Sequence, residues 1–373
     1  MSSSPPPAVR PVFTGLGVLS AFGRGLAPLA AATGEGRPGF AEVTRFDVGR
    51  RTTRTAALLP DPPRLADAVL DAVADACGQA GLPGGRGALD DTPLLLALHS
   101  DLRTGEVAGA VAEGVSALGL AGVTRVYTGA CVAAATAVAD AAALVVAGRY
   151  PRVLVAAGHL VEPGVFAAFD AGRALARDGE LRPFSDGRTG TVLGDAAVAV
   201  VVEADTAAER RGAVPLARLA GWGRSGDAHH VCRPRPDGEG VVRAARAALT
   251  RAGVALAEVG YVNANGTGSP MSDLAEARAL REVFGEGLDR LPVSSSKSVH
   301  GHALEASALL ELAVTIATLD GARLPVNAGW LGPDPEIDLN LVLSGPRPDR
   351  PRYALSLNSA FGGANTALLV AAA

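Results

Sequence analysis

Short apolar runs alternate along the chain with longer segments in which small apolar residues recur every three or four positions. The short runs have the length and composition of β-strands, and the longer segments have the spacing of an amphipathic helix. The run at residues 196–203 is unbroken, which is typical of a strand covered on both faces. This alternation predicts an α/β fold. The first half has predicted strands at PVFTGLGVL, PLLLAL, RVYTG, RVLVAAG and AAVAVVVE and predicted helices at residues 65–81 and 131–148.

A charged stretch at residues 205–215 interrupts the pattern, and a second series of the same kind follows. No low-complexity linker separates the two series. We therefore predict two similar halves at residues 11–205 and 206–373, preceded by a disordered tail at residues 1–10. The second half has predicted strands at LARLAGWG, VGYVNAN and PVSSSKS, helices at residues 240–253, 272–284 and 303–319, and two final strands joined by a glycine turn in RYALSLNSAFGGANTALLVAAA.

Charge and composition exclude several classes of function. The chain has 34 basic and 38 acidic residues among 373, and aromatic residues make up 4%. This balance provides neither a basic stripe nor stacking rings, so no nucleic-acid partner is expected. Three scattered cysteines without a CxxC pair indicate reduced thiols and no metal site. The N-terminus lacks a signal-peptide pattern, and no apolar run reaches membrane-spanning length, so we expect a soluble cytoplasmic protein without a membrane partner.

The most distinctive chemistry lies where a predicted strand ends at Gly129 and a helix begins at or just after Cys131. The amides and dipole of a helix N-terminus stabilise an anion, which predicts a lowered pKa and a nucleophilic thiolate at Cys131. A small buried apolar role is equally compatible with this position, because free cysteines are among the most buried residues. Cys77 fits that second role better, and Cys232 lacks the strand-to-helix setting.

A second group of chemical residues lies in SSSKSVHGHALEASALLE. His302 follows a glycine at a predicted helix start, where an imidazole can donate to a carbonyl or accept a proton. Lys297 and Glu311 can meet only through the fold, and ordinary structural or solvated roles are open for all three residues. GLGVLSAFG does not fit a dinucleotide fingerprint, and SSSKS lacks the glycines of a phosphate loop. No nucleotide site is predicted.

Taken together, six ordered segments resemble the β-ketoacyl synthases of fatty acid and polyketide biosynthesis. The resemblance covers almost the whole chain and implies a thiolase-like fold, in which two similar halves form αβαβα layers. It also implies that no cofactor is bound and that the substrate arrives as a phosphopantetheine or coenzyme A thioester. The segments are FTGLGVLSAFG, the turn at Cys131, RPFSDGRTGTVLGDAA, NANGTGSPMSD, KSVHGHALEASALLE and NSAFGGAN.

The resemblance assigns roles to individual residues of these segments. Cys131 matches the nucleophile that takes an acyl chain from a carrier protein, and His302 matches the second catalytic histidine. Lys297 and Glu311 match a structural pair near the site. Phe361 matches a gatekeeping turn whose backbone N–H completes the oxyanion hole.

Three positions depart from the family pattern. Asn265 stands where the family has its first catalytic histidine, which stabilises the enolate formed when a malonyl thioester loses carbon dioxide. Thr191 replaces a phenylalanine. Glu305 replaces a glycine, and we expect it to be a solvated carboxylate, although it could share a helix face with His302 and raise its pKa.

These departures favour acyl transfer through Cys131, from a carrier-protein thioester to another carrier or a small nucleophile, with weak or no chain extension. One alternative is a true condensing enzyme in which Asn265 replaces the histidine. A second alternative is a non-catalytic chain-length partner of a ketosynthase heterodimer, and a third is a cysteine hydrolase, which would need a histidine beyond His302.

The expected partners are an acyl carrier protein and a second ketosynthase chain, in a homodimer or a heterodimer. Basic residues at Arg50, Arg51 and Arg54 fall where relatives often present charge to the acidic carrier protein. An ordinary solvated face is the equal alternative for these three arginines.

Overall fold

A computed structural model describes residues 9–61, 63–85, 89–321, 323–344 and 350–373 of the chain. The predicted tail at residues 1–10 lies largely outside this described part. Among the described residues, one large sheet has the strand order β11-β10-β12-β13-β9-β1-β8-β7-β5-β6, with β2 added beside β1. The strands are β1 (Pro11–Ser20), β2 (Gly23–Arg24), β5 (Leu94–Leu98), β6 (Val123–Tyr127), β7 (Arg152–His159), β8 (Ala196–Ala204), β9 (Ala217–Gly226), β10 (Val259–Asn263), β11 (Val293–Ser294), β12 (Tyr353–Ser359) and β13 (Ala364–Ala372). A separate pair is formed by β3 (Phe40–Glu42) and β4 (Thr55–Ala57).

The two halves of the sheet repeat one topology. Counted along each half, the strands lie in the order first, fifth, fourth, second, third, which is β1-β8-β7-β5-β6 and β9-β13-β12-β10-β11. The two leading strands, β1 and β9, pair antiparallel at the centre through Val12 with Arg218 and Phe13 with Ala217. The two series of the sequence therefore correspond to two matching sets of strands, while the exact boundary at residue 205 stays a prediction.

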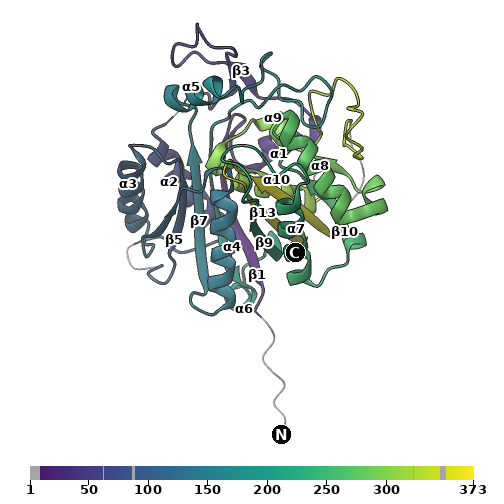
Figure 1. Cartoon of the computed structure of the whole chain (residues 1–373). Coiled ribbons are helices and arrows are strands. Elements are labelled where there is room, and N and C mark those ends of the chain that lie inside the picture. Colours follow the sequence, from purple (N-terminus) through teal and green to yellow (C-terminus); the bar gives the residue numbers. More distant parts are fainter. Residues whose placement is uncertain (1–8, 62, 86–88, 322, 345–349) are drawn as a thin grey trace.

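The two halves of the sheet form two layers, and the helices form three more, one between the halves and one on each outer side. Figure 1 shows this layered arrangement. α4 and α10 pack against each other in the middle and share one core with residues from the strands of both halves. α2 and α3 cover the outer face of the first half, and α7 and α8 cover that of the second. The predicted αβαβα architecture is confirmed. The helices are α1 (Leu26–Glu35), α2 (Leu65–Gln79), α3 (Thr104–Ala117), α4 (Ala133–Val146), α5 (Pro163–Ala171), α6 (Asp205–Arg210), α7 (Glu239–Ala252), α8 (Pro270–Phe284), α9 (Lys297–His300) and α10 (Ser307–Leu319), with short 3-10 helices η1 (Ala130–Val132), η2 (Leu256–Glu258), η3 (Gly285–Asp289) and η4 (Leu304–Ala306).

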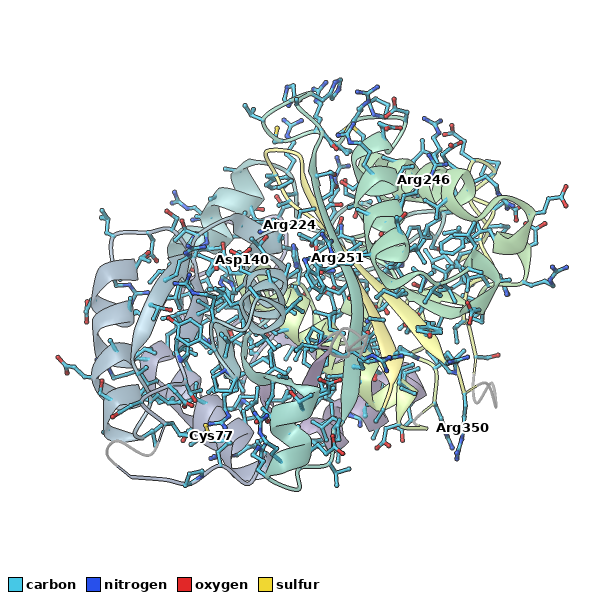
Figure 2. The ribbon with its side chains drawn as sticks, turned by 90° about the horizontal axis from the view of Figure 1, so that it is seen from below. Cys77, Asp140, Arg224, Arg246, Arg251 and Arg350 are labelled. Atoms are coloured by element: carbon cyan, nitrogen blue, oxygen red, sulfur yellow. The ribbon has the colours of Figure 1, made fainter. Side chains whose placement is uncertain are left out.

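The central helix layer is also tied to the second half by charge. Arg224 of β9 donates to Asp140 of α4 at 2.8 Å, and Tyr127 donates its hydroxyl proton to the same carboxylate at 2.8 Å. Figure 2 shows Asp140 and Arg224 near the junction of the halves, with Cys77 toward one side and Arg350 toward the other. Asp140 thereby links β6 of the first half to β9 of the second.

The predicted strand at PVSSSKS is partly wrong. β11 ends at Ser294, and residues from Lys297 form α9 instead. The serines explain the difference, because they offer the backbone local hydrogen bonds that compete with a strand ladder. Ser298 donates its hydroxyl proton to the carbonyl of Ser295 at 2.8 Å, and Ser296 donates its amide to Asn263 at 3.3 Å.

Candidate active site

Cys131 lies in a tight turn between the end of β6 and the start of α4. The residue before it, Ala130, has φ of 51°, a left-handed conformation that a side chain rarely adopts. The turn is continued by η1, so Cys131 stands one 3-10 turn ahead of α4 and not at its first residue. This places the thiol at the wall of a pocket with only 7% of the residue exposed.

His302 is the direct partner of this thiol, although 171 positions separate them in the chain. The distance from His302 Nε2 to Cys131 Sγ is 3.1 Å. The other ring nitrogen, Nδ1, lies 2.8 Å from the hydroxyl oxygen of Ser307 at the start of α10. The backbone amide of His302 donates to the carbonyl of Val192 at 2.7 Å, so both the main chain and the ring are fixed.

The charge state of this pair differs from the sequence prediction. Burial raises the pKa of the Cys131 thiol to about 12, with a further increase from the charge of Glu305 and an opposing effect from Lys297. Burial and the nearby positive charge of Lys297 hold the pKa of His302 well below its usual value. The prediction of a lowered cysteine pKa is therefore wrong, because burial disfavours the thiolate more than the positive charge of Lys297 favours it. At neutral pH the pair consists of a neutral thiol and a neutral imidazole.

Lys297 and Glu311 form an ion pair under the pocket floor. Their charged atoms are 2.6 Å apart, and both side chains are fully buried. Glu311 also accepts a hydrogen bond at 2.6 Å from the side-chain amide of Asn358 at the end of β12. The structure thus brings together two residues that sequence alone left open as separate solvated charges.

Asn265 lines the same pocket as Cys131 and His302. Its side-chain oxygen accepts hydrogen bonds from the Lys297 ammonium at 3.4 Å and from the backbone amide of Ser359 at 3.2 Å. Two donors on Oδ1 fix the orientation of the amide and leave the Nδ2 donor directed away from them. The carboxylate of Glu276, on α8, holds the turn by accepting the backbone amides of Asn265 at 2.7 Å and Gly266 at 2.8 Å. Sequence reasoning did not single out Glu276, although it lies within the NANGTGSPMSDLAE segment.

The pocket has a volume of about 300 Å³ and opens beside Phe361. Phe361 is half exposed, and its ring stacks on that of Phe169 with centroids 5.9 Å apart. Thr191 is buried in the lining, and its hydroxyl has no hydrogen-bond partner among the described residues. In the described part of the chain, no group of three or more histidine, cysteine or acidic residues is arranged to hold a metal ion.

Family models match most of both halves. The model of the N-terminal domain of β-ketoacyl synthase matches residues 98–208, and that of the C-terminal domain matches residues 216–330. The chain belongs to the β-ketoacyl synthase family.

Curated relatives and solved structures agree with this assignment. The chain is 38% identical over 207 residues to a 3-oxoacyl-[acyl-carrier-protein] synthase 2 of Staphylococcus aureus, covering 54% of this chain and 51% of the relative. It is 39% identical over 254 residues to nodulation protein E of Rhizobium meliloti, covering 67% and 62%. The aligned part thus spans about half to three fifths of the curated relatives' lengths.

Two solved structures match nearly the whole fold. The ishigamide ketosynthase/chain length factor matches with a TM-score of 0.89 at 25% identity, and a β-ketoacyl synthase from Burkholderia phymatum STM815 matches with 0.87 at 26%. Both comparisons cover 98% of this chain and 100% of the other. The fold is therefore the thiolase-like α/β fold that the sequence predicted.

Glu305 is the residue that differs most from its predicted environment. The expected solvated carboxylate is instead buried, with 3% of the residue exposed. It does not pair with His302. Its Oε1 lies 3.0 Å from Nδ1 of His99, which follows β5. The short helix η4 turns the side chain away from His302, because Leu304 with φ of 42° breaks the regular helix that the sequence predicted from residue 303.

Three arginines predicted to contact the carrier protein lie at the surface, in the segment between β3 and β4: Arg50, Arg51 and Arg54. Arg51 approaches the carboxylate of Asp170 in α5 at 3.9 Å, and Arg54 donates to the carbonyl of Gly49. α5 also carries Phe169 of the pocket lining. Their proximity to the pocket is consistent with carrier-protein contact, which stays a prediction.

Within the described part, no helix is long and apolar enough to cross a membrane.

Proposed function

We propose that this ketosynthase is an acyltransferase that carries its acyl group on Cys131. The thiol attacks the carbonyl carbon of a phosphopantetheine or coenzyme A thioester, the bond from that carbon to the donor sulfur breaks, and the donor leaves as a free thiol. The cysteine proton passes through His302 to the departing sulfur, so the step needs no oxidant and no metal. A second thiol or small nucleophile then takes the acyl group from Cys131.

The observation that carries this proposal is the 3.1 Å contact between Cys131 Sγ and His302 Nε2 inside the pocket. In a neutral imidazole one ring nitrogen is a donor and the other an acceptor. Nδ1–H can donate to the Ser307 hydroxyl, and Nε2 can then accept the proton of the Cys131 thiol. The contact provides a base in hydrogen-bond reach of the nucleophile. The same contact argues against a purely non-catalytic chain-length role.

Weak chain extension is proposed because of Asn265. Decarboxylation of a malonyl thioester places negative charge on the thioester oxygen, and each lost donor in such a site costs on the order of a hundredfold in rate. Asn265 replaces an imidazole donor by a neutral amide, and its oxygen is occupied by Lys297 and Ser359. Acylation of Cys131 does not depend on that donor.

A decarboxylative condensing enzyme is the second candidate, and one observation favours it. Because both donors lie on Asn265 Oδ1, the Nδ2 group is left to donate toward another acceptor, and Asn265 lines the pocket. An amide in this orientation could hold the thioester oxygen of the extender unit. The two candidates differ only in whether a carbon–carbon bond forms.

The proposed partners are an acyl carrier protein and a second ketosynthase chain. β6 lies at the end of the sheet, and Val126 exposes 37% of its surface there, so a second chain could cover this edge. Among the structural neighbours is a ketosynthase/chain length factor, so both a homodimer and a heterodimer are proposed.

The test is intact-protein mass spectrometry after incubation with acyl carrier protein thioesters. We expect the wild type to gain the mass of one acyl group, Cys131→Ala to gain none, and Cys77→Ala, which removes a thiol of α2 outside the pocket lining, to behave as the wild type. Malonyl carrier protein is then added, and released carbon dioxide is measured. Acylation without carbon dioxide supports the transferase, whereas carbon dioxide with a ketoacyl product establishes the condensing enzyme. Failure of the wild type to become acylated with any donor would overturn both.

A further inference from the structure

A buried carboxylate is carried by an element that packs against the nucleophile turn. Glu305 belongs to η4, which packs against η1, the turn that carries Cys131. Its side chain is 3% exposed. A negative charge in this position opposes the conversion of Cys131 to a thiolate, because like charges repel strongly where solvent is excluded.

The balance of that charge depends on one partly exposed imidazole. His99 Nδ1 lies 3.0 Å from Glu305 Oε1, and the His99 side chain is 32% exposed. The hydrogen bond to Glu305 raises the pKa of His99 above its ordinary value. A pocket of about 20 Å³, large enough for a water molecule, is lined by His99 and His159. His99 can therefore exchange its proton with solvent.

Other charges near the group do not provide the same compensation. His159 Nδ1 lies 3.9 Å from Glu305 Oε2, but burial lowers the pKa of His159 and keeps it neutral. Lys297 faces Cys131 but is already paired with Glu311 at 2.6 Å. The charged and titratable groups near Cys131 are Glu305, Lys297, Glu311 and His302. Those near His99 and its neighbour His159 are Glu305, Asp101, Glu162 and Asp195.

We propose that Glu305 and His99 form a protonation switch that sets the reactivity of Cys131. With His99 protonated, the charge of Glu305 is balanced and the thiolate forms more readily. With His99 neutral, the carboxylate is uncompensated and holds Cys131 as a thiol. This inference rests on Cys131 as the nucleophile of the proposed acyl transfer. Glu305 and His99 act through Cys131 and do not touch substrate.

The test is the pH dependence of Cys131 alkylation by iodoacetamide, followed by peptide mass spectrometry so that Cys77 and Cys232 are read separately. Glu305→Gln keeps an acceptor for His99 and removes the charge, so we expect alkylation about tenfold faster at pH 8. His99→Gln removes the compensating cation, so we expect alkylation several-fold slower at pH 6.5. We expect this difference to shrink as the pH rises and His99 of the wild type loses its proton.

Two further variants keep the test decisive. Glu286→Gln removes an exposed carboxylate of η3 and should leave alkylation of Cys131 unchanged. Glu305→Gly removes the charge without relying on the fit of glutamine and should also accelerate alkylation. The proposal is overturned if neither Glu305 variant accelerates the reaction, or if Glu305→Gln and His99→Gln change it in the same direction at pH 6.5, as a packing defect would.

Alkylation needs no acyl donor, so this test is independent of the proposed function. Opposite shifts in the two variants without any acylation of the wild type would sustain the switch and reject the transferase. Acylation of the wild type with an unchanged alkylation profile in Glu305→Gln would sustain the transferase and reject the switch.

Discussion

At the scale of single residues, the chemistry open to the site depends on which side-chain atoms already have hydrogen-bond partners. Asn265 directs its oxygen at Lys297 and at the backbone amide of Ser359. One ring nitrogen of His302 contacts the thiol of Cys131, and the other contacts the hydroxyl of Ser307. In the proposed site, Cys131 therefore has His302 as a base within hydrogen-bond distance. Asn265 offers an amide donor at the position where the family has an imidazole.

Replacing Asn265 by histidine should restore chain extension. An imidazole at this position would return the second donor for the enolate, so we expect carbon dioxide release from malonyl carrier protein to rise at least tenfold in Asn265→His. Acylation of Cys131 should change little, because that step uses His302. The measurement is carbon dioxide release and ketoacyl product after pre-acylation, with the double variant Cys131→Ala/Asn265→His as the control that must form no ketoacyl product. Unchanged release in Asn265→His would show that Asn265 does not limit extension.

Residue identities near the site were readable from sequence, but their charge states were not. Cys131, His302 and Asn265 stand in ordered motifs, and the structure brings all three to one pocket. The pKa of Cys131 was predicted in the wrong direction because a motif shows the helix that follows and not the depth of burial. Glu305 was misplaced for the same reason, since its partner His99 lies 206 positions away.

At the scale of elements, two ion pairs of similar length join neighbouring helices in opposite environments. Lys297 of α9 and Glu311 of α10 are 2.6 Å apart and fully buried. Arg246 of α7 and Glu282 of α8 are 2.8 Å apart with more than half of each side chain exposed, and Arg246 is labelled in Figure 2. Burial makes loss of one partner costly, because the other charge is left without solvent.

We expect Lys297→Met to lower the free energy of unfolding by about 3–5 kcal/mol, whereas Arg246→Ala should lower it by less than about 1 kcal/mol. The double variant Lys297→Met/Glu311→Leu should recover part of the loss, since no unpaired charge remains. Urea unfolding measures all three. Equal losses in Lys297→Met and in the double variant would mean that the side chains matter for shape and not for charge.

Helices with regular periodicity were predicted well, and the glycine-interrupted helix α3 was not. The helices predicted at residues 65–81, 240–253 and 272–284 agree with α2, α7 and α8 to within two residues at each end. α3 was missed because its glycines obscure the pattern. Gly114 shows the physical reason, since a Cβ there would lie 2.4 Å from the Leu70 side chain of α2. That contact between helices is invisible in the local sequence.

At the scale of the whole molecule, the two halves repeat a close approach of helix to strand. β1 carries Gly15 and Gly17, and β9 carries Gly221 and Gly223. Residues two apart on a strand share one face, and here that face meets the backbone of the covering helix. The G-x-G pattern in GLGVL, which resembles part of a nucleotide motif, is thus a packing feature that recurs in GWGRS.

Adding one methyl group at equivalent positions should damage both halves alike. A Cβ at Gly17 would lie 1.9 Å from the Ala72 carbonyl oxygen of α2, and one at Gly223 would lie 1.9 Å from the Ala244 carbonyl oxygen of α7. Backbone atoms cannot move aside cheaply, so Gly17→Ala and Gly223→Ala should each lower the free energy of unfolding by about 3 kcal/mol.

The matched control for this pair is Gly226→Ala, at the end of β9, where an added Cβ meets nothing within 4 Å. We expect a change below about 1 kcal/mol there. The measurement is urea unfolding of the three variants. A small loss in the free energy of unfolding at Gly223, together with a large loss at Gly17, would show that α7 can move away from its strand and that α2 cannot. Equal losses would mean that neither half tolerates a longer distance between its covering helix and its leading strand.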